Sequence, residues 1–182
     1  GNGCQNSASA TVEDYVCPTI ILSANVNNPK CHGEIGSITA SASGGTPPYS
    51  YQWDNGGPAG DTYGGLTTGT YGVVATDSKG CQASGSFKLT EPAQLTANMG
   101  SKDVSTVGGM DGEAWVTAGG GAGGYTYNWD SGGNTSKITG LAAGTYSVEV
   151  IDKNGCTVSG QTNVNEPDCN LVASIAKTDI SC

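Results

Sequence analysis

Short runs of alternating hydrophobic and polar residues recur along the chain, separated by glycine-rich turns. The clearest run is residues 69–77, where Tyr71, Val73 and Ala75 alternate with small or polar residues before a Gly-Cys turn. This alternation places every second side chain on one face of a β-strand. The sequence has no sustained apolar spacing of 3.6 residues, which an amphipathic helix would need. The pattern predicts an all-β protein.

The same pattern returns once along the chain, about 75 residues later. The Gly-Thr-Tyr run at residues 69–71 recurs at 144–146, and each copy follows a leucine and leads into a Gly-Cys turn. A Leu-x-x-Gly-x-Tyr run entering a strand is typical of the tyrosine corner of a β-sandwich. A repeat of this length corresponds to one small sandwich domain. We expect the structural core to include Trp53, Trp129, Tyr71 and Tyr146.

The repeat divides the chain into four segments. We expect two whole immunoglobulin-like β-sandwich domains in tandem, as beads on a string, at residues 15–92 and 93–167. Residues 1–14 are expected to be the last strand of a preceding repeat, and residues 168–182 the first strand of a following one. Both ends would then be incomplete, either because the chain is part of a longer tandem array or because terminal strands complete a neighbouring sheet.

Strands are predicted wherever alternation lies between turn residues. In the first repeat they are expected at 19–26, 36–43, 49–53, 69–77 and 81–90, and the glycine-rich segment 56–65 is interpreted as a loop. In the second repeat they are expected near 94–99, 112–118, 125–130, 135–139, 144–152 and 156–165.

Composition and charge exclude several classes of function. The 182 residues carry a net charge of −9, and the seven basic residues are all lysines. Nucleic-acid binding needs clustered positive charge to displace phosphate counterions, and insertion into a membrane needs a long apolar run, so neither is expected. With one histidine and no nucleophile elbow or catalytic carboxylate pair, we expect no enzyme activity, no cofactor and no metal site. Seven cysteines indicate disulfides and an oxidising compartment.

One family resemblance can be followed along the first repeat. A Cys-His-Gly step at residue 31, a Gly-Gly-Thr-Pro-Pro turn, a Tyr-Ser-Tyr-Gln-Trp strand ending at Trp53, the Gly-Thr-Tyr run, a Gly-Cys turn at Cys81 and a Glu-Pro pair at Glu91 stand in fixed order. This series resembles the SprB repeat, a family that builds very large surface adhesins of Bacteroidetes, including the gliding-motility adhesin. The second repeat keeps most of the pattern but lacks the leading cysteine. The resemblance implies an immunoglobulin-like module that is secreted and displayed at the cell surface.

The cysteine spacing suggests a disulfide scheme. Cys31 and Cys81 would close a loop of 50 residues in the first repeat, worth roughly 4 kcal/mol in the chain-entropy treatment. Two shorter loops of 13 residues would tie a last strand to the following linker, each worth about 3 kcal/mol. These predicted pairs are Cys4–Cys17 and Cys156–Cys169. Cys182 stands two repeats after Cys31 and is expected to pair with a residue beyond this chain.

Exposed aromatic residues are the remaining candidates for a binding surface. Trp115 aligns with Thr39 of the first repeat, which places it on the outward face of a strand. We interpret it as a candidate interface with another subunit or domain, the alternative being a loop that folds over it. Two aromatic stripes could stack on sugars, but packing around a core tryptophan explains them better. They are Tyr49, Tyr51 and Trp53 in the first repeat and Tyr125, Tyr127 and Trp129 in the second.

These observations favour a non-enzymatic structural module of an extracellular fibre or cell-surface adhesin. Its expected partners are copies of itself or further repeats of the same fibre, and a surface polysaccharide is also considered. The alternative function is a carbohydrate-binding module of a secreted protein, for which Trp115 and Tyr49 would be the contact residues.

Overall fold

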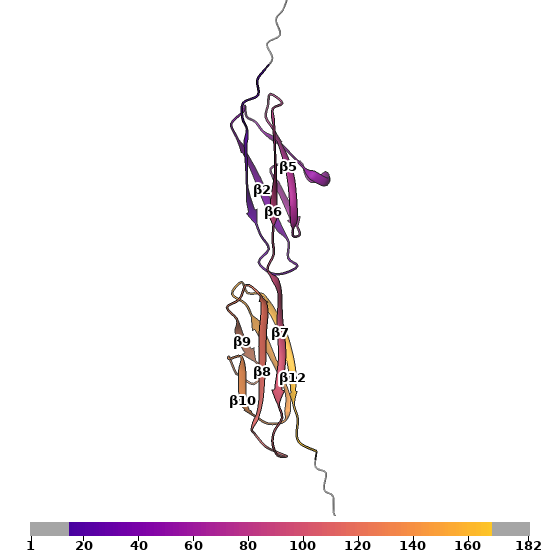
Figure 1. Ribbon diagram of the computed structural model, residues 1–182, viewed down its shortest axis with the longest axis vertical. Helices are drawn as coiled ribbons and strands as arrows, with labels where there is room; N and C mark the ends of the chain where they lie inside the picture. Colours follow the sequence, from indigo (N-terminus) through magenta and orange to yellow (C-terminus); the bar gives the residue numbers. More distant parts are fainter. Residues whose placement is uncertain (1–14, 169–182) are drawn as a thin grey trace, which may run out of the picture. The chain divides into compact units, whose positions relative to one another are not determined.

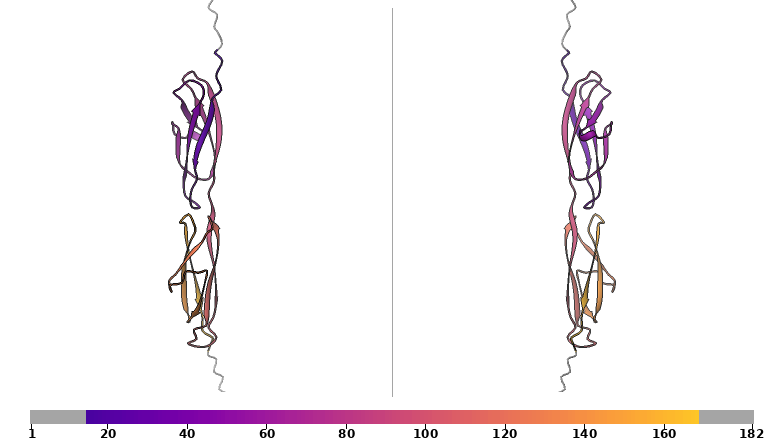
Figure 2. Two further views of the ribbon diagram at one scale, coloured as in Figure 1. Left: turned by 90° about the vertical axis from the view of Figure 1, so that its left-hand side faces the viewer. Right: turned by 90° about the vertical axis from the view of Figure 1, so that its right-hand side faces the viewer.

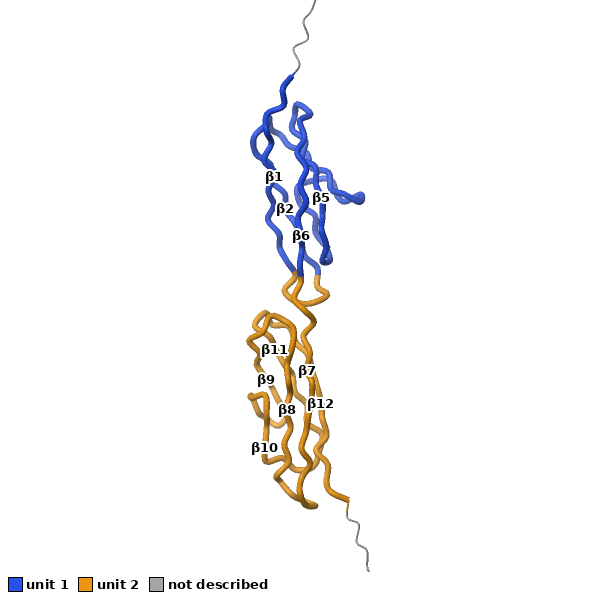
Figure 3. Tube along the Cα trace, viewed as in Figure 1, with its two compact units in different colours: residues 1–28, 35–90 blue, residues 29–34, 91–182 orange. Residues whose placement is uncertain are grey.

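A computed structural model describes residues 15–168, which form β-strands and one short 3₁₀ helix. The chain divides into two compact units. Unit 1 contains the residues up to Asn28 and Ile35–Thr90, and unit 2 contains Pro29–Glu34 and the residues from Glu91 onward (Figure 3). The loop Pro29–Glu34 therefore belongs to unit 2, although it connects two strands of unit 1.

Unit 1 is a sandwich of two three-stranded antiparallel sheets (Figure 1). The first sheet has the order β1-β2-β4, with β1 (Ile21–Asn27), β2 (Gly36–Ser43) and β4 (Thr62–Leu66). The second has the order β3-β5-β6, with β3 (Ser50–Trp53), β5 (Gly69–Thr76) and β6 (Gln82–Leu89), and the 3₁₀ helix η1 (Asp54–Gly56) follows β3.

Unit 2 repeats this arrangement, and within each unit the strands of both sheets lie nearly along one axis (Figure 2). One sheet has the order β10-β8-β7, with β7 (Ala93–Lys102), β8 (Gly112–Gly121) and β10 (Lys137–Leu141). The other has the order β12-β11-β9, with β9 (Thr126–Trp129), β11 (Gly144–Ile151) and β12 (Thr157–Val164).

Each unit packs its core around one tryptophan. Trp53 and Trp129 are both 2% exposed. The Trp53 indole donates a hydrogen bond from Nε1 to the carbonyl of Gly60 at 2.9 Å, and the Trp129 indole donates to the carbonyl of Thr135 at 2.8 Å. The polar edge of each ring is therefore satisfied while its apolar body is buried. The other buried members are Ile38, Ala40, Leu66, Val73 and Leu89 in unit 1, and Val104, Ala114, Val116, Leu141, Val148, Val150 and Val164 in unit 2.

Both units contain the tyrosine corner that the sequence predicts. The Tyr71 hydroxyl donates to the carbonyl of Thr67 at 2.8 Å, and the Tyr146 hydroxyl donates to the carbonyl of Ala142 at 3.0 Å. Each bond ties the start of the long central strand to the turn before it. Together with the core tryptophan, this corner is typical of an immunoglobulin-like sandwich. The predicted all-β, immunoglobulin-like fold is confirmed.

The first and last strands of unit 1 run in the same direction. At one end, Cys17 before β1 is bonded to Cys81 before β6, with the two Cα atoms 5.6 Å apart. At the other end, the Asn28 side chain after β1 accepts a hydrogen bond from the backbone N–H of Thr90 after β6, at 2.9 Å. In unit 2 the Asp103 side chain accepts the equivalent bond from Asn165 at 2.8 Å.

This parallel arrangement overturns the predicted pair Cys31–Cys81. Cys31 follows the end of β1, whereas Cys81 precedes the start of β6. Strands of this length separate those ends by about 25 Å, far beyond the roughly 7 Å between Cα atoms that a disulfide spans. The structure instead joins Cys17 to Cys81, so the predicted pair Cys4–Cys17 is also wrong.

The predicted pair Cys156–Cys169 is wrong as well, because Cys156 is bonded to Cys31, with Cα atoms 5.7 Å apart. Cys156 is the counterpart of Cys81, but the position that corresponds to Cys17 is occupied by Pro92. Cys156 therefore has no cysteine partner at the start of β7 and bonds the loop Pro29–Glu34. Cys4, Cys169 and Cys182 lie outside the described residues, as do the strands predicted within the segments 1–14 and 168–182.

One strand of unit 1 lies inside the segment predicted as a glycine-rich loop. β4 pairs with β2 and places Leu66 in the core. Tyr63 from the same strand packs against Trp53 and Tyr71, with ring centroids 5.6 and 5.8 Å away. The loop interpretation of residues 56–65 is therefore wrong in its second half, because two adjacent glycines in β4 hide the alternation. Among the described residues, no helix has the length and apolar character needed to cross a membrane.

Candidate interaction surface

The outward face of the β1-β2-β4 sheet in unit 1 carries small polar side chains. Ser23 and Ser41 face each other across β1 and β2, and their hydroxyls are 2.8 Å apart. Thr39 and Thr62 do the same across β2 and β4 at 3.1 Å. These hydroxyls satisfy one another across the strands, and Ile21 at the start of β1 is a large apolar side chain exposed on the same face.

The equivalent face of unit 2 carries Trp115 in the place of Thr39. Trp115 lies on the central strand β8, opposite Gly100 on β7 and Lys137 on β10. It is 36% exposed, and a Cβ atom added to Gly100 would collide with its indole. The ring therefore lies over the bare backbone of Gly100 and keeps part of its surface in solvent. A glycine covered by a cross-strand aromatic ring is a known way of stabilising a sheet, so packing explains part of this position.

Charged residues flank Trp115 on the same face. The Lys137 ammonium lies 2.6 Å from the Glu113 carboxylate. The hydrogen bond from Lys137 is the main cause that lowers the pKa of Glu113. Burial acts in the opposite direction, and the positive charges of Lys137 and Lys102 add to the lowering. The face therefore combines an aromatic ring with a fixed ion pair, which unit 1 does not have at the equivalent positions Thr39 and Thr62.

The predicted aromatic stripes do not form a second platform. Tyr49 and Tyr125 are half-buried, and their hydroxyls donate to the carbonyls of Gly44 and Gly120. The Tyr51 hydroxyl accepts a hydrogen bond from the backbone N–H of Ala42 at 3.0 Å. These phenols serve the sandwich itself, which agrees with the interpretation that the stripe packs around the core tryptophan.

A buried aspartate precedes the last strand of each unit. Asp77 is 5% exposed, and its carboxylate accepts backbone hydrogen bonds from Thr46, Lys79 and Cys81, each at 2.9 Å. Burial opposes the charge of Asp77, but the backbone donors outweigh it and hold its pKa below the usual value. The side chain thus fixes the turn that positions Cys81.

Asp152 repeats this role in unit 2. It is 4% exposed and accepts hydrogen bonds from Ala122 at 2.8 Å, Asn154 at 2.8 Å and Cys156 at 3.0 Å. The Ala122 donor is the strongest cause of its lowered pKa, with burial acting in the opposite direction and the other donors adding to the shift. Turn capping therefore accounts for both carboxylates. Within residues 15–168, no three His, Cys, Asp or Glu side chains come close enough to hold a metal ion.

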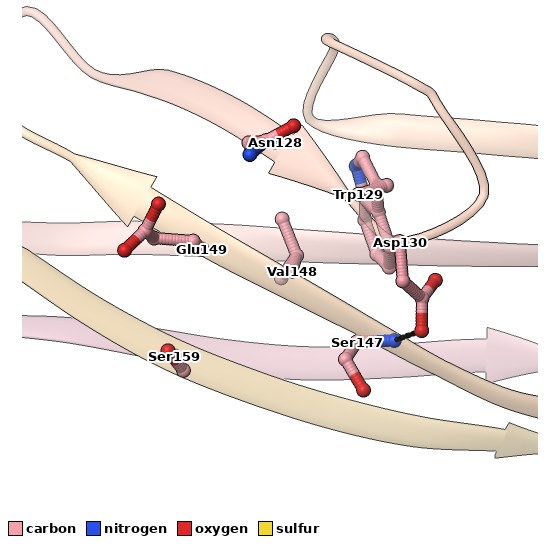
Figure 4. Close-up of a pocket in the computed structure, with 7 residues that line it drawn as sticks. All are labelled: Asn128, Trp129, Asp130, Ser147, Val148, Glu149 and Ser159. Carbon is pink, nitrogen blue, oxygen red and sulfur yellow. Dashed lines mark hydrogen bonds between the residues drawn. The ribbon is translucent and has the colours of Figure 1, made fainter.

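A shallow hollow of about 250 Å³ lies on the β9-β11-β12 sheet of unit 2 (Figure 4). Asp130 reaches across it and accepts a hydrogen bond from the backbone N–H of Ser147 at 3.0 Å. Unit 1 has a hollow at the equivalent place, lined by Asp54 and Gly72 among others. The hollow occurs in both units, and the Asp130 carboxylate already accepts a backbone hydrogen bond. We therefore interpret the hollow as part of the scaffold.

The loop Pro29–Glu34 is held in unit 2 by several bonds besides Cys31–Cys156. The Lys30 carbonyl accepts a hydrogen bond from the Asn154 side chain at 2.9 Å. Glu91 accepts a hydrogen bond from the backbone N–H of Gly33 at 2.6 Å and lies 3.3 Å from Nδ1 of His32. This cluster fixes the loop on both sides of its cysteine.

Glu91 is a structural position that the sequence reasoning did not assign. Its counterpart Glu166 accepts a hydrogen bond from the backbone N–H of Gly108 at 2.9 Å. The two Glu-Pro pairs stand 75 residues apart, as do the two glycines. This common spacing of 75 residues could have revealed the contact. A glutamate and a glycine that both recur at the same interval are candidates for a hydrogen bond with each other.

One family model and several solved structures are similar to parts of this chain. Residues 23–58 match the family model of the SprB repeat, as the resemblance in the first repeat predicts. No curated protein matches the chain. Among solved structures, similar folds occur in the N-terminal eight immunoglobulin domains of Down syndrome cell adhesion molecule and in a C-terminal fragment of intimin in complex with the intimin-binding domain of its translocated receptor.

Both likenesses are distant. Each has 16% identity and a TM-score of 0.43. The first covers 84% of this chain and 25% of the cell adhesion molecule, and the second covers 83% of this chain and 65% of the intimin fragment. This chain therefore spans a quarter of the first of these structures and about two thirds of the second.

Proposed function

We propose that this chain, which carries an SprB repeat at residues 23–58, is a non-enzymatic structural module of a bacterial cell-surface adhesin or extracellular fibre. The observation that carries the proposal is the covalent fastening of a repeated sandwich: Cys17–Cys81 and Cys31–Cys156 use every cysteine among the described residues. Disulfides of this kind persist in oxidising compartments outside the cytoplasm. The repeat itself supplies rigid modules that can be joined in series.

Localisation and covalent state can be tested together in cells that produce the chain. We expect antibodies raised against the two units to label intact cells, and external protease to remove the label. The protein recovered without reductant should have no alkylatable thiol at Cys17, Cys31, Cys81 or Cys156. A chain found inside the cell with free thiols at these positions would contradict the proposal. Electron microscopy of the cell surface should show filaments if the module belongs to a fibre.

The denatured mass then distinguishes two forms of fibre. A subunit of about the size of this chain, 18.2 kDa, would favour assembly by strand exchange between subunits. A much larger mass would favour a long tandem array.

The outward face around Trp115 is the surface we assign to contact with another subunit or domain. The exposed indole, beside the ion pair Lys137–Glu113, is the feature that unit 1 does not share at Thr39. Exposed tryptophan is enriched at protein contacts. Replacing Trp115 should weaken unit 2 without unfolding it, because the ring covers Gly100 but is partly in solvent.

The change Trp115→Ser should weaken assembly, while unit 2 still folds and loses about 1–2 kcal/mol of its free energy of unfolding in urea. The matched control is Thr39→Ser, at the equivalent position of unit 1. It should change neither assembly nor the free energy of unfolding. Loss of folding in Trp115→Ser would show that the residue belongs to the core. Binding on a glycan array that Trp115→Ser abolishes, with assembly unchanged, would favour the alternative function of carbohydrate binding.

A further inference from the structure

The disulfide Cys31–Cys156 joins two positions that are 125 residues apart along the chain. A covalent path that enters near Cys17 can therefore follow the backbone to Cys31, cross the disulfide and leave through Cys156. This path omits the backbone from residue 32 to residue 155. The omitted segment contains β2 to β11, which supply both core tryptophans.

Within the described residues, each side of this path contains one strand. Between Cys17 and Cys31 the chain forms β1, and after Cys156 it forms β12. A strand rises about 3.3 Å per residue, close to the limit of roughly 3.3–3.6 Å per residue for any backbone. Pulling on the chain can therefore lengthen β1 and β12 only slightly.

We infer that this protein bears tension along β1, the Cys31–Cys156 bond and β12, and that both sandwich cores are shielded from stretching. Ordinary tandem domains transmit force through every residue, so each domain unfolds and adds its full length. Here a covalent shortcut prevents that extension. The inference concerns a mechanical function, and it rests on the disulfide connectivity without requiring that the proposed adhesin or fibre role is correct.

The second disulfide does not shorten this path. Cys17–Cys81 spans 64 residues, but a route through it must still follow the backbone from Cys81 to Cys156. That route is longer than the one through β1, so the bond carries no tension while Cys31–Cys156 is intact. Once Cys31–Cys156 is lost, Cys17–Cys81 becomes the only shortcut that remains among the described residues. The two disulfides therefore have unequal mechanical roles, which makes the inference testable.

The bonds around Cys31 support a direct transfer of force. The Lys30 carbonyl is held by Asn154, and Gly33 is held by Glu91. These contacts hold the loop in place on both sides of the cysteine, so that tension reaching Cys31 does not first have to draw out a slack segment.

The test is single-molecule force spectroscopy on the full chain, held by a handle at each terminus, with the final contour length as the readout. The first variant is Cys31→Ser/Cys156→Ser. It should lengthen the chain by 125 − 64 = 61 residues, about 210 Å, because Cys17–Cys81 is then the remaining shortcut. The variant with all four serines should lengthen it by 125 residues, about 430 Å.

The matched control is Cys17→Ser/Cys81→Ser, which removes the other disulfide. We expect the same final contour length as in the unmodified chain, even if unit 1 is less stable. A gain in length in this control, or no gain in Cys31→Ser/Cys156→Ser, would overturn the inference. Neither result would bear on cell-surface localisation, so failure of the mechanical function and failure of the proposed function can be told apart.

Discussion

The two units share a scaffold and differ in how their last strand is fastened. Both bury a tryptophan, form a tyrosine corner and cap the final turn with an aspartate. In unit 1 the cysteine before the last strand bonds the start of the first strand, whereas in unit 2 its counterpart bonds the loop Pro29–Glu34. The outward faces also differ, since unit 2 carries Trp115 where unit 1 carries Thr39.

This difference separates the residues that make the sandwich from those that connect it. Positions that point into the core or cap a turn recur with the repeat, because each sandwich needs them to bury its surface and satisfy its backbone. The cysteine partners and the outward residue Trp115 do not recur, although the two sandwiches have the same strand arrangement. We therefore assign function to the positions where the two units differ.

The largest expected effect comes from the disulfide that only unit 1 has. Cys17→Ser/Cys81→Ser should lower the free energy of unfolding of unit 1 by about 4 kcal/mol, because the bond closes a loop with a sequence separation of 64 residues. Hydrogen exchange in increasing urea, followed on peptides from each unit, measures this. Core peptides of unit 2 should change much less, and an equal loss in both units would contradict the assignment.

The reciprocal change transfers this fastening to unit 2. In Pro92→Cys/Cys31→Ser we expect the new thiol to bond Cys156, as Cys17 bonds Cys81, and a non-reducing peptide map would show it. The control Cys31→Ser leaves Cys156 without that partner, so the difference between the two variants isolates the transferred bond. A free thiol at position 92 would show that the first strands of the two units are not equivalent.

A smaller effect is expected from acid, and it should be alike in both units. The pKa values of Asp77 and Asp152 are lowered in the folded state. Each carboxylate therefore contributes stability above its unfolded pKa of about 3.9, and that contribution is lost as the pH falls through the lower folded pKa. Asp77→Asn should destabilise unit 1 at pH 7, and the difference from the unmodified chain should shrink as the pH approaches 2.

Asp152→Asn should act in the same way on unit 2, and urea unfolding at several pH values, with hydrogen exchange as the readout for each unit, checks both. Asp61→Asn is the control, because Asp61 is exposed and caps no turn before a last strand. A difference that stays constant from pH 7 to pH 2 would show that the charge of these aspartates does not contribute.

The smallest of these effects is expected from the tyrosine corners. Tyr71→Phe and Tyr146→Phe each remove one hydrogen bond, to Thr67 or Ala142, and should cost about 1 kcal/mol in the unit concerned. Denaturant midpoints measured for each unit check this. Equal costs would support equivalent corners, while a cost in one unit alone would show that the other corner is held by packing.

The repeated positions were predictable from sequence because spacing alone reveals them. The Gly-Thr-Tyr runs gave the tyrosine corners, and the alternation around residues 36–43 and 112–118 gave the central strands of two sheets. β4 was missed because its pair of glycines leaves only Tyr63 and Leu66 to show which face is buried. Its pairing with β2 depends on tertiary packing, which local alternation does not report.

The disulfide pairing could not be predicted from spacing, because even the four cysteines among the described residues allow three pairings, and the sequence has seven. Cys81 and Cys156 recur with the repeat, whereas Cys17 and Cys31 have Pro92 and Thr106 as counterparts. The choice between partners depends on the parallel direction of β1 and β6, which places Cys17 beside Cys81 and removes Cys31 to the far end. The prediction used only the number of residues in each loop, whereas the observed pairs depend on which strand ends lie together in the fold.

The bond between a glutamate and a glycine N–H has a consequence for how such a chain can change over time. Glu91 and Glu166 each accept a hydrogen bond from the backbone N–H of a glycine, and this bond does not depend on the side chain of the donor residue. Duplication or exchange of a whole repeat in the gene would preserve this glutamate–glycine hydrogen bond. The cysteine at position 31 is different, since it works only opposite a second cysteine. Duplication of a repeat therefore preserves the glutamate–glycine bond, whereas the Cys31–Cys156 disulfide is preserved only if both cysteines are kept.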